Sequence, residues 1–214
     1  MPHVVLIGDS IFDNAAYTRG GPDVVSQVRA LLPHGWEATL LAVDGSTTDH
    51  VVGQLGRLPN RATHLVLSVG GNNALRHLAI FEAPSTSIGQ SVSVLAQIAS
   101  DFEKSYRTVI AACLATARPL AVCTIYNGYF DDPSFQRIAS AALTFFNDAI
   151  IRVAIEHALP VIDLRFVCAS ADDYANPIEP SSVGGEKIAR VIVGLVCGTN
   201  GSNASPPATR IVIS

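Results

Sequence analysis

Charged residues are scarce in this sequence of 214 residues. Asp, Glu, Lys and Arg together make up 15% of the chain, against about 25% in an average soluble domain, whereas 49% of the residues are hydrophobic. A composition this apolar excludes a chain that is disordered along most of its length, because a large hydrophobic surface has to be buried. The length fits one domain better than two.

Basic runs and cofactor motifs are also missing. The 14 Lys and Arg residues are scattered and are outnumbered by 18 Asp and Glu residues, so the sequence lacks the basic patch of a nucleic-acid-binding protein. It contains no P-loop, no GxGxxG after a strand-like run and no cluster of metal ligands. We therefore expect no metal or other cofactor and no nucleic-acid partner, and a small neutral substrate or a protein partner instead.

Disulfide and membrane patterns are equally weak. The four cysteines lie in apolar surroundings without CxxC spacing, which is typical of small buried side chains in a reducing compartment. The longest apolar run, residues 109–125, is interrupted by Arg118 and Pro119 and predicts the end of a helix followed by a buried strand, not a membrane span. Because the first strand-like run begins at residue 3, we expect no secretion signal and a cytoplasmic protein.

What the sequence does contain is a regular alternation of two hydrophobic patterns. Almost continuously apolar runs, typical of strands buried on both faces, occur at residues 3–8, 38–43, 64–69, 120–125 and 160–164. Segments with the 3.6-residue period of helices alternate with them, at residues 23–32, 49–58, 87–117, 134–157 and 182–196. This order predicts a three-layer αβα sandwich around a flavodoxin-like, five-stranded parallel sheet with strand order 2-1-3-4-5.

One domain, residues 1–197, accounts for this pattern. After Cys197 the chain becomes rich in Gly, Ser, Asn and Pro, so we expect residues 198–214 to form a flexible tail. The last apolar residues of this tail either add an edge strand or contact a neighbouring molecule. The apolar stripe of the helix predicted at 134–157 is broad, and an exposed outer edge would provide the surface of a homodimer.

Polar residues follow the first three predicted strands. The first strand ends in Gly8-Asp9-Ser10, the second leads into Asp44-Gly45-Ser46 and the third into Gly70-Gly71-Asn72-Asn73. Each segment alone is also compatible with an ordinary turn or helix cap. Because parallel strands end at the same edge of a sheet, a hydroxyl, a glycine N–H and an amide donor would converge there. Acyl transfer uses such groups to attack a carbonyl and to stabilise the oxyanion that forms.

In this order the segments resemble the conserved blocks of the SGNH (GDSL) hydrolases. Gly8-Asp9-Ser10 with Asp13 is similar to the first block of the family, Gly45 to the second and Gly70-Gly71-Asn72-Asn73 to the third. The segment from Asn176 to Ser181 is similar to the family's Asp-x-x-His-Pro-Ser block, and the resemblance extends from residue 4 to about residue 197. It implies the αβα fold predicted above and a serine hydrolase that acts on small carboxylic esters.

The resemblance also implies a role for each matching residue. Ser10 would be the nucleophile, and the oxyanion hole would consist of the backbone N–H groups of Ser10 and Gly45 and the side chain of Asn72. Contacts with the substrate are expected from three further residues beside these loops and after the fourth strand, namely Asp9, Asn73 and Tyr126.

The last block departs from the family pattern. Glu179 stands where the family has its general-base histidine, and Asn176 stands where it has an acid. A glutamate with an ordinary pKa of about 4.3 is roughly two units less basic than imidazole, but burial raises such a pKa toward 6 or 7. We therefore predict that Glu179 is the base, next to a neutral Asn176. Two alternatives stay open. In the first, the base is a histidine from elsewhere in the chain, His50 or His77. In the second, the protein is catalytically impaired and binds an ester, a glycan or a protein partner.

Overall fold

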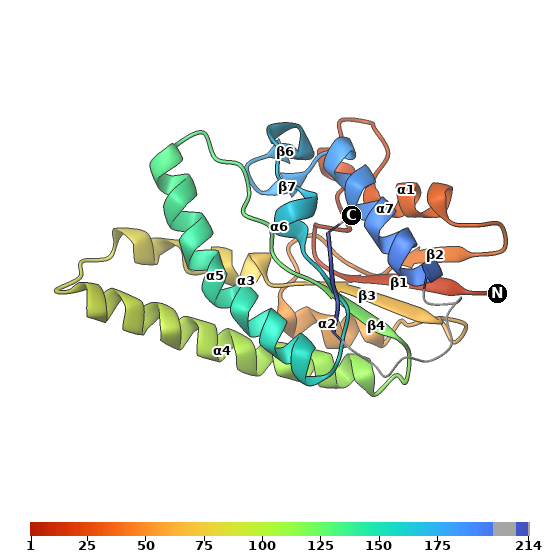
Figure 1. Ribbon diagram of the computed structural model, residues 1–214, viewed down its shortest axis with the longest axis horizontal. Helices are drawn as coiled ribbons and strands as arrows, with labels where there is room; N and C mark the ends of the chain where they lie inside the picture. The colour runs from red at the N-terminus through yellow and green to blue at the C-terminus, as the bar shows by residue number, and fades with distance from the viewer. Residues whose placement is uncertain (199–208, 214) are drawn as a thin grey trace.

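The computed structural model describes residues 1–198 and 209–213, which form a parallel sheet between two layers of helices (Figure 1). In spatial order the strands of the sheet are β2 (Glu37–Leu40), β1 (His3–Gly8), β3 (His64–Ser68), β4 (Leu120–Cys123), β5 (Val161–Ile162) and β8 (Ile211–Val212). All neighbouring strands are parallel. The predicted order 2-1-3-4-5 is confirmed, and β8 adds a sixth strand at the edge. The rest of the predicted tail, residues 199–208 and 214, lies outside the described residues.

The two faces of β1 show how the layers are packed. Val4 and Leu6 belong to a core with the helices α1 (Val24–Leu31), α6 (Leu164–Val167) and α7 (Ser182–Gly198). Val5 and Ile7 belong to a second core with the helices α2 (Thr48–Leu55), α4 (Ile88–Leu114) and α5 (Pro133–Glu156). Side chains of a strand point alternately to opposite faces, so an uninterrupted apolar run serves both cores at once. The predicted αβα sandwich is confirmed.

Strand β4 ends two residues before the predicted boundary. Thr124 and Ile125 are buried like the strand itself, but they bond to side chains: Thr124 Oγ1 donates to Asp163 Oδ1 at 2.9 Å, and Ile125 N donates to Asn147 Oδ1 at 2.7 Å. The apolar run therefore extends beyond the strand because the start of the following loop is also part of the core.

Helix α5 has the length and apolar composition of a membrane-spanning helix. In this fold it contacts α4, and its inner face, which includes Phe146, Ile150 and Val153, is buried in the second core. Asp132 caps its first turn through a hydrogen bond from Ser134 N to Oδ1 at 2.8 Å, and Pro133 begins the helix. These contacts are those of a core helix.

Several short elements that the sequence analysis did not predict lie around the carboxyl ends of the strands. They are η1 (Ala15–Tyr17), α3 (Gly71–Leu75), η2 (Leu78–Glu82), η3 (Ala171–Asp173), β6 (Tyr174–Asn176) and β7 (Glu179–Pro180). β6 and β7 form a small antiparallel hairpin. The N-terminal halves of α4 and α5, together with η2, project beyond the sheet at this end (Figure 1).

Candidate active site

Ser10 lies just after β1, where the chain turns at Gly8. Gly8 has φ = 128°, and a Cβ atom there would lie 1.7 Å from the carbonyl oxygen of Ser68, so the close approach of β1 to β3 requires glycine. The side chain of Gln54 accepts a hydrogen bond from Gly8 N at 2.8 Å and donates one to Gly8 O at 2.7 Å. The backbone that presents Ser10 is thus held from two sides, and the Ser10 side chain lines a pocket.

The loop that contains Gly45 is bound directly to the segment that follows Ser10. Asp44 N donates to Asp13 Oδ2 at 2.9 Å, and Tyr17 OH donates to Asp44 Oδ2 at 2.6 Å. The Asp44 carboxylate stabilises the protonated phenol and raises the pKa of Tyr17 to about 12. Gly45 has φ = 74°, a left-handed conformation that glycine adopts without strain. These contacts bring the first two predicted loops together.

The third loop joins them through Asn72. Gly70, with φ = 136°, precedes α3, and a Cβ atom there would lie about 3 Å from the Phe102 ring and the Ile125 side chain. From the first turn of α3, Asn72 Nδ2 donates a hydrogen bond to the carbonyl oxygen of Ser46 at 3.0 Å. All three predicted loops therefore meet at one edge of the sheet.

Three hydrogen-bond donors at this edge are unused. Within the described part of the chain, the backbone N–H groups of Ser10 and Gly45 donate no hydrogen bond. The Asn72 amide has two N–H donors and uses one of them on Ser46 O. These are the groups that the sequence predicts for an oxyanion hole. Ser10 and Asn72 line the pocket, whereas Gly45 lies on the neighbouring loop and is not among the lining residues.

Glu179 belongs to the β6–β7 hairpin and is 7% exposed. Burial raises the pKa of Glu179 to about 7, the nearby Ser10 side chain opposes that rise, and the charge of Asp44 adds to it. Its Oε2 atom is buried and has no hydrogen-bond partner within the described residues. The structure therefore places a carboxyl group with a raised pKa in the same pocket as Ser10.

Asp9 is a second carboxyl group with a raised pKa in this region. It is 2% exposed, and burial raises its pKa to about 7, with a smaller contribution from the charge of Glu179. Ile11 N donates to Asp9 Oδ1 at 3.2 Å, which lowers this pKa without cancelling the effect of burial. Because the two carboxyl groups interact, ionisation of one disfavours ionisation of the other, and their titration is shared.

The hairpin that carries Glu179 is fixed by its backbone carbonyl groups. Ile178 O accepts a hydrogen bond from Tyr126 OH at 2.6 Å, and Pro177 O accepts one from Tyr129 N at 2.8 Å. On the other side of Glu179, Pro180 O accepts from Asn14 Nδ2 at 3.1 Å. The residues around Glu179 are thereby bound to the loops that follow β4 and β1.

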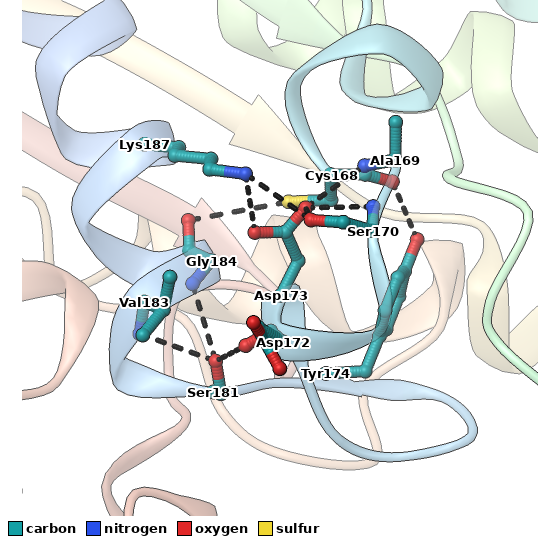
Figure 2. Close-up of polar contacts among 10 residues, drawn as sticks. All are labelled: Cys168, Ala169, Ser170, Asp172, Asp173, Tyr174, Ser181, Val183, Gly184 and Lys187. Carbon is teal, nitrogen blue, oxygen red and sulfur yellow. Dashed lines mark hydrogen bonds and ion pairs between the residues drawn. The ribbon is translucent and has the colours of Figure 1, made fainter.

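An ion pair between the buried Asp173 and the exposed Lys187 anchors the base of the hairpin (Figure 2). The Asp173 side chain accepts hydrogen bonds from Ala169 N at 3.0 Å, Ser170 N at 2.9 Å and Ser170 Oγ at 2.8 Å, and Lys187 Nζ lies 2.6 Å from Asp173 Oδ1. Burial disfavours the charged carboxylate, but these partners outweigh burial and lower the pKa of Asp173. The Asp173 carbonyl accepts from Ser181 N at 2.9 Å, which closes the hairpin two residues after Glu179.

Asn14 was not identified from the sequence, and it connects the two halves of the site. Its side chain is fully buried: Nδ2 donates to Pro180 O, and Oδ1 accepts from Val24 N at 2.9 Å. It follows Ser10 on the same loop and contacts the residue next to Glu179. Its position in the sequence, four residues after a candidate nucleophile, is the only signal that could have drawn attention to it.

Asn73 and Asn176, both predicted in the site, have other roles in the structure. Asn73 Oδ1 accepts from Thr48 N at 3.2 Å and Nδ2 donates to Thr48 Oγ1 at 2.9 Å, so the side chain secures the start of α2. Asn176 is exposed, and its Oδ1 accepts from Ile178 N at 3.0 Å within the turn of the hairpin. Neither side chain lines the pocket that contains Ser10 and Glu179.

The two histidines that the sequence left as alternatives differ in position. His50 Nδ1 accepts a hydrogen bond from Thr47 N at 3.0 Å and forms part of the cap of α2. His77 follows α3, is exposed and lines the pocket. Within the described residues, no histidine forms a hydrogen bond with Ser10 or Glu179, and no group of three or more His, Cys, Asp or Glu residues is arranged to hold a metal ion.

The pocket itself is polar at one end and apolar elsewhere. Its polar lining includes Asp9, Ser10, Asn72 and Glu179, and Tyr126 contributes a ring beside them. The remaining lining consists mainly of aliphatic and phenylalanine side chains from α3, η2, α4 and α5. The sequence predicted the residues of the polar end and Tyr126, but not the apolar walls that α3, η2, α4 and α5 supply.

Replacing Asn14 by alanine is expected to weaken catalysis through Glu179. The change leaves Pro180 O and Val24 N without partners in the interior, which costs about 1–3 kcal/mol of stability. A small displacement of Glu179 from Ser10 is expected to lower kcat about 10- to 100-fold with little change in KM. Greater hydration of Glu179 would also move the midpoint of the pH–rate profile to lower pH.

Gln27→Ala is the matched control. Gln27 is also a buried amide that donates to two carbonyl groups, those of Pro22 and Ser182, but its hydrogen bonds reach neither residues 9–14 nor residues 176–180. This variant should lose comparable stability and keep its kcat and pH profile. Equal kinetic effects of the two substitutions would show that Asn14 is only structural.

Comparisons with known proteins agree with this fold. The model of the GDSL-like Lipase/Acylhydrolase family matches residues 6–184. A search of curated proteins finds no match.

The chain is also similar to solved structures. The lipase Lip_vut3 from a goat rumen metagenome has a TM-score of 0.70 at 19% identity, and the match covers 89% of this chain and 95% of the lipase. The acetyl xylan esterase AlAXEase has a TM-score of 0.68 at 18% identity, and the match covers 91% of this chain and 99% of the esterase. The extracellular lipase of Streptomyces rimosus has a TM-score of 0.66 at 16% identity, and the match covers 92% of this chain and 99% of the lipase.

Proposed function

Because the chain belongs to the GDSL-like lipase/acylhydrolase family, we propose that it is a serine hydrolase of carboxylic esters in which Glu179 replaces the general-base histidine. The observation that carries the proposal is that Ser10 and a buried Glu179, whose pKa is raised to about 7, line the same pocket. The unused N–H groups of Ser10, Gly45 and Asn72 lie on the loops that meet at this edge.

Acylation begins when Glu179 accepts the proton of Ser10 and the Ser10 oxygen attacks the ester carbonyl carbon. The carbonyl oxygen becomes an oxyanion, to which the three N–H donors bind. The bond between the carbonyl carbon and the alcohol oxygen then breaks, and protonated Glu179 returns its proton to the departing alcohol. The product of this half-reaction is an acyl ester of Ser10.

Deacylation repeats these steps with water. Glu179 removes a proton from a water molecule, whose oxygen attacks the acyl carbon of the Ser10 ester. The tetrahedral intermediate uses the same donors, and Ser10 leaves with the proton held by Glu179. A carboxylic acid is released, and the enzyme returns to its starting state.

A glutamate is suited to this role only because of its surroundings. A general base works best when its pKa lies near the working pH, and the pKa of about 7 brings Glu179 into the range of an ordinary imidazole. The cause is burial in the pocket wall, as in other carboxyl groups that act as acids or bases near neutral pH. Asn176 has no part in this version of the mechanism, because its side chain is bound to the hairpin turn.

The similar solved structures support the same reaction class. They include proteins described as lipases, an acetyl xylan esterase and a phospholipase A1. At identities of 13–19% these likenesses concern the fold, so the assignment to esters depends on the residues of this chain.

A fluorophosphonate probe is expected to label the protein once, on Ser10. Such probes react with a serine hydroxyl that a neighbouring base activates and whose developing charge an oxyanion hole stabilises. Intact-mass measurement followed by peptide mapping would identify the labelled residue. The Ser10→Ala protein, with all other serines in place, is the control and should remain unlabelled.

No labelling of the folded wild-type protein would instead support the alternative of an impaired relative that only binds its ligand. Labelling of both proteins would place the reactive serine elsewhere. Either result would overturn the proposed mechanism.

A further inference from the structure

We infer that the apolar part of the pocket binds the acyl chain of the substrate, and that Phe81, Phe130 and Phe135 form the wall that selects chains longer than acetyl. This inference rests on the proposed function, because it takes Ser10 as the point at which the acyl group is attached. It concerns the substrate that the site prefers, which the position of Ser10 and Glu179 alone does not specify.

The composition of the pocket argues against a small polar acyl group. Beyond Ser10, Asn72 and Glu179, the lining is supplied mostly by aliphatic and aromatic side chains, including Leu78 and Leu143. The apolar lining continues from these three polar residues to side chains of η2, α4 and α5. An acetyl group would leave most of this apolar surface in contact with water, whereas a longer chain would cover it.

Three phenylalanine rings connect the segments that surround this space. The ring of Phe81, in η2, makes an edge contact with Phe135 in the first turn of α5, with centroids 6.0 Å apart. Phe135 makes a second edge contact with Phe130 in the loop after β4, at 4.8 Å. All three rings line the pocket and are partly exposed. We refer to Phe81, Phe130 and Phe135 as the aromatic wall.

The acyl chain suits this space better than the alcohol does. During turnover the alcohol has to leave before water can attack, whereas the acyl group stays attached to Ser10 through both half-reactions. A partly enclosed apolar pocket continuous with Ser10 can hold the chain that stays without slowing the release of the group that leaves. The polar alcohol is then expected to exit toward solvent.

The first test is a series of p-nitrophenyl esters with acyl chains of two, four, six and eight carbons. Burial of each additional CH₂ group is expected to raise kcat/KM about fourfold until the chain fills the pocket. A second comparison uses methyl octanoate and octyl acetate, which have similar size but carry the long chain on opposite sides of the ester. Methyl octanoate should be the better substrate, and preference for octyl acetate would contradict an acyl pocket.

Variants of the aromatic wall test its role in selectivity. In Phe81→Ala and Phe135→Ala, the ratio of kcat/KM for the octanoyl ester to that for the acetyl ester is expected to fall about tenfold or more, since one ring supplies the contact of several CH₂ groups. Phe166→Ala is the control, because Phe166 is 64% exposed and lies outside the pocket. An unchanged ratio in both wall variants would remove the wall from chain selection.

The outcome also distinguishes failure of this inference from failure of the proposed function. Equal kcat/KM across the series would leave an esterase without an acyl pocket. If no ester is hydrolysed, binding of methyl octanoate and methyl acetate to the Ser10→Ala protein, measured by calorimetry, decides the question. Stronger binding of methyl octanoate, weakened by Phe81→Ala, would support the pocket on its own, and equal or absent binding of both esters would overturn it.

Discussion

Replacement of Ser10 by alanine is expected to lower kcat for ester hydrolysis by at least about 10³-fold, the range seen when a nucleophile of a serine hydrolase is removed. The variant keeps the three N–H donors and the pocket, but it can form no acyl intermediate. It also loses the hydroxyl that opposes the rise in the pKa of Glu179. Initial rates with a p-nitrophenyl ester, measured after the background rate of the ester in buffer is subtracted, would give the change.

Ser105→Ala is a suitable control for this experiment. Ser105 is also a partly buried serine whose hydroxyl takes part in hydrogen bonds, with Phe102 O at 2.8 Å and Thr48 Oγ1 at 3.1 Å, but it lies outside the pocket. It should keep nearly full activity, and both variants should unfold at temperatures close to that of the wild type. If Ser10→Ala retained more than about a tenth of the activity, Ser10 would not be the nucleophile.

The polar end of the site could be predicted because its residues follow strands whose order the sequence also predicts. The apolar runs that become β1 and β3 are buried on both faces, the run at β2 is partly buried, and helical segments separate the three. Those two facts require a parallel sheet, and a parallel sheet brings the strand ends to one edge. Ser10, Gly45 and Asn72 therefore come together through rules that act over short stretches of sequence.

The contacts that position Glu179 could not be predicted in this way. Asn14 and Pro180 are 166 residues apart, and Tyr126 and Ile178 are 52 apart. The hairpin has strands of only three and two residues, too short for a hydrophobic period to reveal. Its position depends on hydrogen bonds between loops and on the ion pair of the buried Asp173 with the exposed Lys187, which no local pattern encodes.

Asn73 and Asn176 illustrate the limit of assigning roles by position in a motif. An asparagine side chain can bind a substrate or satisfy nearby backbone groups, and residue type does not distinguish these uses. Both side chains are engaged by Thr48 and Ile178, which become neighbours only once α2 and the hairpin have formed. The apolar pocket has the same origin, because it forms between helices that extend past the sheet.

Replacement of Glu179 by glutamine is expected to lower kcat about 10²- to 10⁴-fold, the usual contribution of a general base, and to remove the main step from the pH profile. In the wild type kcat/KM should rise as the pH increases through about 7, because only the ionised carboxylate accepts the Ser10 proton. The midpoint belongs to Glu179 and Asp9 together, since both have a pKa of about 7 and the charge of Glu179 raises that of Asp9. Activity measured from pH 5 to pH 9 in both proteins would show this.

The stability of the same variant separates a lost base from a damaged fold. The pKa of Glu179 is higher in the folded protein than the 4.5 of a free glutamate, so its ionisation opposes folding: the penalty is absent below about pH 4 and fully present above about pH 7. Glu179→Gln should therefore be at least as stable as the wild type at pH 8 while being far less active. The control Glu186→Gln, on the surface of α7 beside Arg190, should leave the activity unchanged. Full activity of Glu179→Gln, with the pH step retained, would assign the proton transfer to another group, and His77, which lines the pocket, would then be the residue to replace.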